Sequence, residues 1–441
     1  MEKATFPRGI HPPENKEGTS DKPLVPLPPP EKVVIPLLQH FGCAAAPLVK
    51  KGQDVFLGQK IGEAKTHFSA HVHASVSGRV LSVEDYNHCS GYPVLAVTIA
   101  NDGKDQMTSE TDGALNPFSL SPEEIRQKVR EAGIVGLGGA AFPTAVKLSP
   151  PKDKHIDTLI INGCECEPLL TADYRQMLEY PEAIIKGAEL ARVAVGARRT
   201  LIGIEDNKGD AASILSEHSD HFPAAIRLLK TKYPQGAEKN LIYALLRREV
   251  PRGGLPFDVG VVVQNVGTVK AIWEAVSAGK PLYERAVTVA GNGIREPRNI
   301  WARIGTPSQT AVDFCGGLIG DVNTIIVGGP MMGIAQWSLD VPIVKGTSGI
   351  LAWRTSAPAA EHPCIRCARC IEHCPMGLSP TQLAKFIQFE KWEQAEKWGA
   401  LDCVECGCCQ YICPSKIPLV HWLRLGKNKI SRAKRKKSDR P

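Results

Sequence analysis

The sequence predicts a multidomain protein of mixed α/β and α+β class, and three observations lead to this fold class. Strands and helices alternate between residues 121 and 285, which indicates a largely parallel sheet with helices on both faces. Short β-type segments with glycine turns fill residues 33–100 and 286–340. Two cysteine-rich segments flank a helical stretch within residues 355–423. The length of 441 residues is enough for about three domains.

The N-terminal third is expected to be an arm followed by a small β domain. Residues 1–32 are rich in Pro, Lys and Glu and predict an extended arm. The turns around Val49–Val55 and Gly58–Gly62 resemble those of biotinyl/lipoyl-type barrel-sandwich domains, although no carrier lysine is evident. His71 and His73 could bind a metal, but two histidines alone are more often surface residues. Strands are expected at Val33–Leu38, Asp54–Leu57, Gly78–Val83 and Val94–Ile99.

The rest of the chain divides by the same signals. Residues 101–121 are polar and predict a linker, and Ser121 with Pro122 is typical of a helix start. A second linker is expected at residues 355–363, and a helix at residues 379–399. Buried strands are expected at Thr158–Asn162, Thr200–Ile204 and Val259–Val263, helices at Pro181–Val195, Gln235–Arg248 and Val266–Ala278, and further strands at Ala286–Ala290 and Asn323–Val327.

Composition and charge narrow the classes of function. No stretch of 18 apolar residues occurs, and the N-terminus has no apolar signal segment, so we expect a protein of the cytoplasm or of a cytoplasmic membrane face. The 14 cysteines therefore indicate metal ligation rather than disulfides. The net charge of +7 lies in the tail, residues 424–441, where nine Lys/Arg accompany one Asp. This tail is either a solvated end or a segment attracted to an anionic membrane or acidic partner. Nucleic acid is not expected as a partner.

The two cysteine segments carry the strongest chemical signal. Both have the spacing C-x₂-C-x₂-C-x₃-C-P of bacterial ferredoxins. A zinc site also accepts four cysteines, but it does not need this spacing twice. Cys408 falls outside the spacing and is expected to be a spare thiol. Two neighbouring clusters indicate electron transfer. Because the fourth cysteine of each segment ligates the other cluster, the predicted [4Fe–4S] ligand sets are Cys364, Cys367, Cys370 and Cys413, and Cys403, Cys406, Cys409 and Cys374.

A glycine loop at residues 135–144 is the second chemical feature. Gly136, Gly138 and Ala141 satisfy G-x-G-x-x-A, but a predicted helix rather than a strand precedes them, so the dinucleotide fingerprint is not met. Small residues nevertheless allow backbone N–H groups to approach a phosphate or a flat ring. Lys147 follows at a distance suited to pairing with a phosphate. By itself the loop could equally be a structural turn.

The segment NGCECEP, residues 162–168, follows a predicted strand directly. In open α/β sheets the carboxyl ends of strands face the ligand crevice. Glu165 and Glu167 are not expected in the core at that position, and they are candidates for a role in the chemistry. Cys164 and Cys166 form a C-x-C pair that can bind metal but has no third ligand nearby.

Together these motifs resemble two related families. The glycine loop, residues 162–168, Gly236–Glu238 and Gln264–Thr268 resemble the flavin-binding, NADH-oxidising subunit of respiratory complex I. With the N-terminal β domain, the opening Phe6–Pro13 and the paired cysteine segments added, the chain is similar over nearly its whole length to the C-subunit family of Rnf complexes. These complexes are membrane-bound, ion-translocating ferredoxin:NAD⁺ oxidoreductases.

The resemblance implies a fold and a set of site residues. The implied units are a barrel-sandwich domain, a Rossmann-like α/β domain for FMN and NADH at 121–285, a soluble-ligand-binding β-grasp domain at 286–340 and a helical ferredoxin-type domain. Phe142 would stack on the nicotinamide nucleotide. Glu167 would contact its ribose or amide, and with Glu165 it is the implied catalytic pair. The implied FMN-binding residues are Gly136, Gly138, Gly139, Lys147, Asn162, Glu165, Asn265 and Thr268.

The resemblance also implies a function. The chain would be one peripheral copy in a hetero-oligomeric membrane complex, on the cytoplasmic face, with membrane and iron–sulfur subunits as partners and ferredoxin as an indirect one. It would transfer electrons between two [4Fe–4S] clusters and NAD(H) through FMN. The alternatives are the NADH-oxidising subunit of another redox complex and a non-catalytic iron–sulfur adaptor.

Overall fold

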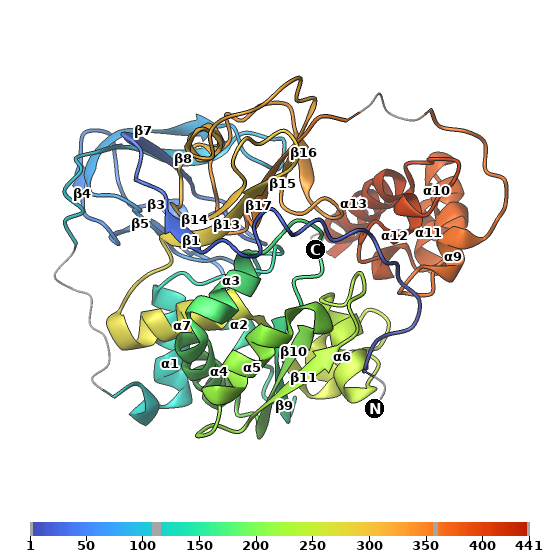
Figure 1. Cartoon of the computed structure of the whole chain (residues 1–441), viewed down its shortest axis with the longest axis horizontal. Coiled ribbons are helices and arrows are strands. Elements are labelled where there is room, and N and C mark those ends of the chain that lie inside the picture. Colours follow the sequence, from blue (N-terminus) through green and yellow to red (C-terminus); the bar gives the residue numbers. More distant parts are fainter. Residues whose placement is uncertain (1–2, 108–115, 356–359, 439–441) are drawn as a thin grey trace.

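The computed structural model describes residues 3–107, 116–355 and 360–438. Figure 1 shows a β unit from the N-terminal part of the sequence in blue, an α/β unit mainly in green, a second β unit in yellow to orange, and a helical unit in red. The multidomain α/β and α+β class expected from the sequence is therefore confirmed.

The α/β unit contains α1 (Pro122–Glu131), α2 (Thr144–Lys147), β9 (Thr158–Gly163), α3 (Ala172–Glu179), α4 (Pro181–Val195), β10 (Arg199–Glu205), α5 (Gly209–Glu217), β11 (Ala224–Leu229), α6 (Glu238–Leu246), β12 (Val261–Asn265) and α7 (Val266–Ala278). Its sheet is parallel, in the order β11-β10-β9-β12. Leu159 and Ile161 of β9 pack with residues of α1, α4 and α7, whereas Ile160 packs with residues of α6. Alternate side chains of one strand thus fill the core on both faces of the sheet.

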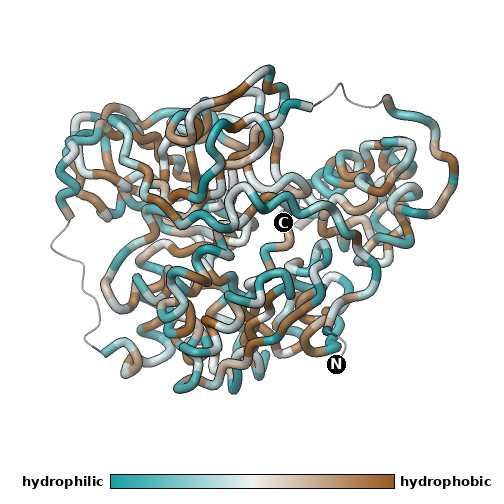
Figure 2. The backbone as a smooth tube through the Cα atoms, viewed as in Figure 1, coloured by the Kyte–Doolittle hydropathy of each residue, from teal (hydrophilic) through white to brown (hydrophobic). Residues whose placement is uncertain are grey.

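The N-terminal β unit consists of two sheets that enclose a small core. The strands are β2 (Lys32–Pro36), β3 (Ala46–Pro47), β4 (Asp54–Val55), β5 (Lys60–Glu63), β6 (Val72–His73), β7 (Gly78–Tyr86) and β8 (Val94–Asn101). One sheet has the order β2-β8-β7-β4 and the other β3-β5-β6. Val33, Ile35, Val97 and Ile99 are fully buried between them. Figure 2 shows hydrophobic stretches along the strands of both this unit and the α/β unit.

The expectation that His71 and His73 lie on the surface is wrong. Each is only 5% exposed, because strand β6 lies under the α/β and second β units. Lys345 donates from Nζ to His71 O at 2.6 Å and to Gly133 O at 2.7 Å, and so ties three units together. Burial lowers the pKa of both imidazoles, which favours their neutral form. The two histidines are therefore packing residues of an interface.

The second β unit is built from segments that are distant in the sequence. It contains β1 (Leu24–Pro26), β13 (Glu284–Ala290), β14 (Arg298–Arg303), α8 (Ser308–Phe314), β15 (Thr324–Val327), β16 (Ile334–Gln336) and β17 (Gly349–Trp353). Its sheet has the order β1-β14-β13-β17-β15-β16. Strand β1 comes from the N-terminal arm, and β17 lies beyond residue 340, where no strand was expected. Both strands pair through backbone hydrogen bonds that a local pattern of residues does not reveal.

The N-terminal arm ties the units together rather than standing free. Ala4 forms a parallel bridge with Leu229 at the end of β11. Gly9 N–H donates to His373 O in the helical unit at 3.3 Å. The dark blue trace in Figure 1 then runs from the helical unit to β1 in the second β sheet. The arm therefore fixes the helical unit against the α/β unit.

The helical unit holds the eight ferredoxin-spaced cysteines. Its helices are α9 (Arg369–Glu372), α10 (Pro380–Gln388), α11 (Trp392–Lys397), α12 (Cys408–Tyr411) and α13 (Leu419–Ser438). The single helix expected at residues 379–399 is wrong, because the chain turns at Glu390, which has a φ of 55°. The basic tail continues α13 up to Ser438. Among the residues described above, none of the helices combines the length and the apolar character that a membrane crossing requires.

Candidate functional site

The glycine loop has a closed base and an open tip. At the base, Gly136 N–H donates to Phe142 O at 2.8 Å. At the tip, the N–H groups of Gly138, Gly139 and Ala140 have no acceptor among the described residues, and all three residues are exposed. Gly139 has a φ of 111°, and a Cβ at this position would enter open space. Three exposed N–H groups on adjacent small residues fit the phosphate of a flavin mononucleotide.

Residues of the α/β unit and of the second β unit hold the glycine loop from behind. Leu137 N–H donates to Thr268 Oγ1 at 2.9 Å, and the buried Arg285 donates from Nη2 to Leu137 O at 3.3 Å. Asn265 caps α7 by accepting from the N–H groups of its first turn. A Cβ on Gly138 would lie 3.4 Å from Asn265 Nδ2. The oxygens of the Asn265 and Thr268 side chains thus support the loop and helix backbone.

Lys147 ends helix α2, which directly follows the glycine loop, and its charge is paired. Its Nζ donates to Glu238 Oε1 at 2.6 Å and to Val263 O at 3.1 Å. Glu238 begins α6, and Val263 is in β12, so the lysine joins the loop to the carboxyl end of the sheet. The ion pair is partly exposed, which leaves the ammonium group within reach of an added anion.

The segment after β9 is fixed by hydrogen bonds to its neighbours. Asn162 donates from Nδ2 to Gly236 O at 2.9 Å. Glu165 has a φ of 46°, and its carboxylate accepts from the N–H groups of Asp173 at 2.7 Å and Tyr174 at 3.1 Å. Because these N–H groups open α3, Glu165 places its negative charge at the positive end of that helix.

Asp173 is a site residue that the sequence reasoning missed. Its Oδ2 accepts from Asn265 Nδ2 at 2.6 Å, immediately behind the glycine loop. Burial and, next, the charge of Glu165 raise the pKa of Asp173 to about 7. An acidic residue in the first turn of the helix that follows NGCECEP was the available signal. The carboxyl group of Asp173 can therefore hold a proton near neutral pH.

Glu167 lies where three units meet. Its carboxylate accepts from Met331 N–H at 2.9 Å and from Met332 N–H at 3.0 Å, both in the turn between β15 and β16. The hydroxyl oxygen of Tyr233 also lies 3.5 Å from Glu167 Oε1. Burial raises the pKa of Glu167 to about 7, and the two backbone N–H groups oppose that shift. Glu167 therefore anchors the second β unit to the end of β9.

Phe142 contacts two aromatic rings of the N-terminal β unit. Its ring stacks on Phe41, with centroids 5.7 Å apart and planes inclined by 27°. Phe68 meets Phe142 edge-on at 6.1 Å. The structure thus brings residues from positions 41, 68 and 142 together at the side of the glycine loop.

His40 fastens the two loops that carry Phe41 and Phe68. His40 Nε2 lies 2.9 Å from Cys43 O in the first loop and 3.1 Å from Ala70 N in the second. The ring is 8% exposed, and burial, followed by the charge of Lys345, lowers the pKa of His40 to about 4. In the unfolded chain the pKa of a histidine is near 6.5. Between pH 6.5 and 4, therefore, His40 gains a proton only in the unfolded state.

We therefore expect the folded chain to lose stability through His40 as the pH falls from 6.5 to 4. The loss is on the order of 3 kcal/mol in the free energy of unfolding. In a His40→Gln variant the thermal midpoint should depend less steeply on pH over this range than in the wild type. His218→Ala, at the exposed end of α5, is the matched control. Equal slopes for His40→Gln and wild type would show that the imidazole is not held neutral.

The ferredoxin-spaced cysteines gather in two neighbouring groups in the helical unit, here called cages, and their assignment to two clusters stays a prediction. One cage gathers at Cys370, whose pKa is raised by burial and also by the charges of Cys413 and Cys364. The other gathers at Cys409, whose pKa is raised by burial and by neighbouring thiolates. Those neighbours include the other three members of its predicted set, and a cavity in the helical unit is lined by all four, Cys374, Cys403, Cys406 and Cys409.

The donor set fits iron–sulfur cubes better than zinc. Thiolates on one zinc ion lie about 3.8 Å apart, since each zinc–sulfur bond is about 2.3 Å. Within the described ranges no three His, Cys, Asp or Glu side chains converge closely enough for a single metal ion. Four thiolates can coexist in a buried cage only with compensating cations. Thiols that share a cage without converging on one point suit a larger group such as a [4Fe–4S] cube.

Tyr233 links the second cage to the α/β unit. It is 1% exposed, and its hydroxyl donates to Cys406 O at 2.7 Å. Ile10, Cys406, Cys408 and Met331 pack around it in one apolar cluster. Tyr233 stands three residues before the motif Gly236–Glu238 named above. Its contact partner Cys406 is 173 positions away in the sequence, so no local pattern predicts the contact.

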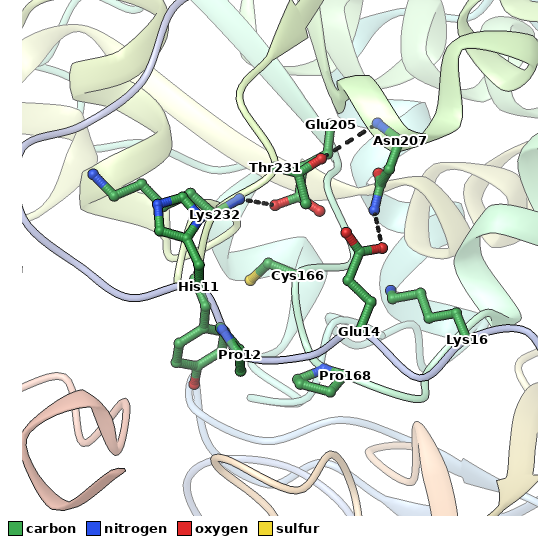
Figure 3. Close-up of a pocket in the computed structure, with 11 residues that line it drawn as sticks. His11, Pro12, Glu14, Lys16, Cys166, Pro168, Glu205, Asn207, Thr231 and Lys232 are labelled. Carbon is green, nitrogen blue, oxygen red and sulfur yellow. Dashed lines mark hydrogen bonds between the residues drawn. The ribbon is translucent and has the colours of Figure 1, made fainter. Parts of the chain in front are cut away.

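A polar cavity lies at the carboxyl ends of β9, β10 and β11, beneath the arm (Figure 3). Lys16 Nζ donates to Glu165 O at 2.6 Å and to Leu170 O at 2.8 Å. Asn207 donates from Nδ2 to Glu14 at 2.6 Å. The ammonium group of Lys16 and the amide group of Asn207 thus already have partners within the protein. Through Lys16, the arm holds the backbone of Glu165 in place. Further residues around the cavity are His11, Pro12, Cys166, Pro168, Glu205, Thr231, Lys232 and Tyr233.

The C-x-C pair is packed rather than exposed as a ligand. Cys164 is fully buried with its Sγ 3.7 Å from Gly203 O, and Cys166 Sγ accepts from Gly236 N–H at 3.3 Å. Burial raises the pKa of both thiols. The two thiols are therefore protonated and packed against the backbone, where they support the contact between the segment after β9 and Gly236.

Four known domain families match successive parts of the chain. Family models match an RnfC barrel sandwich hybrid domain at residues 4–104, a Nuo51 FMN-binding domain at 129–274, an SLBB domain at 286–335 and a 4Fe-4S dicluster domain at 359–414. The glycine loop, NGCECEP and the end of β12 all fall inside the FMN-binding match. FMN and [4Fe–4S] clusters as cofactors are thereby confirmed.

Three relatives match over most of their length. The C subunit of the Na(+)-translocating ferredoxin:NAD(+) oxidoreductase complex of Acetobacterium woodii is 45% identical, covering 98% of each chain. Its counterpart in the proton-translocating ferredoxin:NAD(+) oxidoreductase complex of Clostridium ljungdahlii is 46% identical, covering 90% of this chain and 88% of the relative. The counterpart in the ion-translocating oxidoreductase complex of Rhodobacter capsulatus is 42% identical, covering 97% and 84%.

Among solved structures, a chain of an NAD+-reducing [NiFe]-hydrogenase in the H2-reduced state is similar at a TM-score of 0.48 and 19% identity. The similarity covers 74% of this chain and 64% of that chain.

Proposed function

The chain belongs to the family of C subunits of ion-translocating ferredoxin:NAD(+) oxidoreductase complexes, and on this premise we propose that it transfers electrons between NAD(H) and the iron–sulfur carriers of such a complex. It is an oxidoreductase subunit of a multi-subunit complex. Its direct partners are then the membrane and iron–sulfur subunits, with one copy of this chain bound on the cytoplasmic face and ferredoxin acting through them.

The contact between Tyr233 and Cys406 carries this proposal. It joins the α/β unit, with its open glycine loop, to a cysteine cage in the same chain. An iron–sulfur adaptor without flavin would have no need of a loop with three exposed N–H groups that lack a protein acceptor. Packing of the Cys406 cage against the α/β unit holds the cage at a fixed position relative to that unit.

The residues around the glycine loop would hold the flavin. The N–H groups of Gly138 and Gly139 would bind the phosphate, and Lys147 would add a positive charge beneath it. Thr268 and Asn265 keep the loop in position. When bound, FMN supplies two-electron exchange with NAD(H) and one-electron exchange with the clusters.

The predicted NAD(H) contacts lie beside this bed. Phe142 offers an aromatic surface at the side of the loop. Glu165 and Glu167 follow β9, so they could contact a ligand that binds at the carboxyl edge of the sheet. Because the carboxylate of Glu167 already accepts two N–H groups of the second β unit, NAD(H) bound there would also contact the turn at Met331 and Met332.

The two cages differ in exposure, and this supports an order of carriers. Cys406 is 8% exposed and contacts the α/β unit through Tyr233. Cys364 and Cys367 of the other cage are exposed. The Cys406 cage is therefore the one next to the nucleotide site, and the Cys364 cage is the one that a partner subunit reaches.

Lys147→Glu tests the flavin site. The substitution replaces the phosphate's positive partner by a negative charge opposite Glu238, so we expect the flavin content of the purified chain to fall about ten-fold or more. NADH oxidation with an artificial acceptor should fall in proportion. The measurement is flavin and iron per chain after gel filtration.

Lys152→Glu is the matched control, since it reverses an exposed charge five residues away. The iron content should not change in either variant. If Lys147→Glu keeps its flavin while wild type also contains it, Lys147 is not part of the bed. A wild-type chain with full iron but no flavin and no response to NADH would instead support the adaptor.

A further inference from the structure

Two phenylalanines of the N-terminal β unit leave large apolar surfaces open beside the glycine loop. Phe41 is 55% exposed and Phe68 is 48% exposed, although both rings contact Phe142. Exposed aromatic rings that gather in one place on a soluble protein generally mark a binding surface. The α/β match covers residues 129–274 only, so this surface is contributed by a different domain.

The two loops are shaped to bring these rings to that place. Phe41 N–H donates to Ala141 O at 3.1 Å, which ties the first loop to the glycine loop itself. Cys43 N–H donates to Phe68 O at 2.9 Å, which ties the first loop to the second. Gly42 has a φ of 114°, and a Cβ there would lie 2.0 Å from Phe68 O, so only glycine permits this approach.

The position of the rings identifies the chemical class of the ligand. Phe41 already covers one face of Phe142. The flat ring of a ligand that binds beside the glycine loop would therefore contact Phe41 and Phe68. The exposed N–H group of Ala140, which is not assigned to the flavin phosphate above, lies next to Ala141, and the carbonyl oxygen of Ala141 accepts from Phe41 N–H. A ligand that combines an aromatic base with phosphates matches both features.

We propose that Phe41 and Phe68 of the barrel-sandwich domain complete the dinucleotide site by stacking on an aromatic base of NAD(H). This inference rests on the proposed function and gives the N-terminal domain a role in the reaction. Phe41 and Phe68 act on binding only, since no titratable group is involved. A base stacked on an aromatic side chain gains enough affinity for roughly a five- to hundred-fold effect on binding.

The test is steady-state NADH oxidation by the full chain with an artificial acceptor. Phe41→Ala and Phe68→Ala should each raise the KM for NADH about ten-fold, with kcat at saturation, flavin content and iron content unchanged. Phe41→Trp should restore a KM close to that of the wild type. Phe56→Ala is the matched control, because Phe56 is 47% exposed on the same domain and pairs with no ring among the described residues.

Inhibition by fragments of the dinucleotide shows whether its adenine or its nicotinamide stacks on the two phenylalanines. If adenine stacks here, the inhibition constant of ADP-ribose should rise in Phe41→Ala. If nicotinamide stacks here, that of nicotinamide mononucleotide should rise instead.

An unchanged KM in the double variant, while wild type oxidises NADH, would overturn the inference and leave the proposed function intact. An unchanged KM with loss of co-purifying membrane subunits would also overturn it, by assigning the rings to a partner surface. A wild-type chain that holds no flavin, or fails to oxidise NADH, would instead refute the proposed function on which the inference rests.

Discussion

Replacing Cys406 by alanine is expected to halve the iron content of the chain, from about eight atoms to about four. Cys406 belongs to the cage that contacts the α/β unit through Tyr233. Losing one of four ligands from a buried cage should empty it, because the remaining thiolates can no longer surround the cube. Iron and sulfide analysis of the purified variant measures this effect.

The same variant separates the two redox sites. The flavin bed shares no residue with the cage, so NADH should still bleach the flavin. Reduction of the remaining cluster by NADH should be at least about ten-fold slower, since the nearer carrier is missing. Rapid mixing with NADH under anaerobic conditions resolves the two absorbance changes.

Cys408→Ala is the matched control for Cys406→Ala. Cys408 lies two residues away, is fully buried and lines the same cavity, but falls outside the ferredoxin spacing. The control should keep about eight iron atoms. Equal iron loss in both variants would mean that burial at this position, rather than ligation by Cys406, maintains the cage.

The second large effect is expected at the tip of the glycine loop. A Gly139→Val variant should retain less than about a tenth of the wild-type flavin while keeping its iron. Gly139 has a φ of 111°, so a branched side chain would force the backbone to rotate and turn the neighbouring N–H groups away. Losing two charge-assisted hydrogen bonds to a phosphate accounts for an effect of this size. Flavin released by acid precipitation of the protein measures it.

Gly196→Val controls for backbone strain. Gly196 caps α4 with a φ of 71°, is exposed, and lies at the amino end of β10, away from the loop. Both variants should lose stability by about 1–2 kcal/mol, and only Gly139→Val should lose flavin. If Gly196→Val loses as much flavin, the effect is one of stability, and the tip does not bind the phosphate.

Local patterns predicted the parts of the fold that depend on local chemistry. Helix α7 spans Val266–Ala278 as expected, because Asn265 caps its start and Gly279 ends it with a positive φ. The crossed cysteine sets stay a prediction from spacing, which the nearness of Cys413 to Cys370 and of Cys374 to Cys409 supports. Strand β11 was missed because it is a half-exposed edge strand, whose buried face gives only a weak pattern.

The site was harder to predict where it depends on contacts between units. Gly138 and Gly139 were expected at a phosphate and form an open cradle. Asn265 and Thr268 lie at the same place, but their oxygens support the loop. Phe41 and Tyr233 had no local signal, since each meets its partner only after separate domains pack. Burial of His71 has the same origin.

The central claim is that one chain holds both the flavin that reacts with NADH and the clusters that accept its electrons. Anaerobic titration of the purified chain with NADH, followed by absorbance and electron paramagnetic resonance, tests it most directly. The account predicts that NADH bleaches the flavin and then produces the signal of reduced [4Fe–4S] clusters, in proportion to the NADH added. Clusters that dithionite reduces but NADH does not, in a chain that contains its flavin, would contradict it.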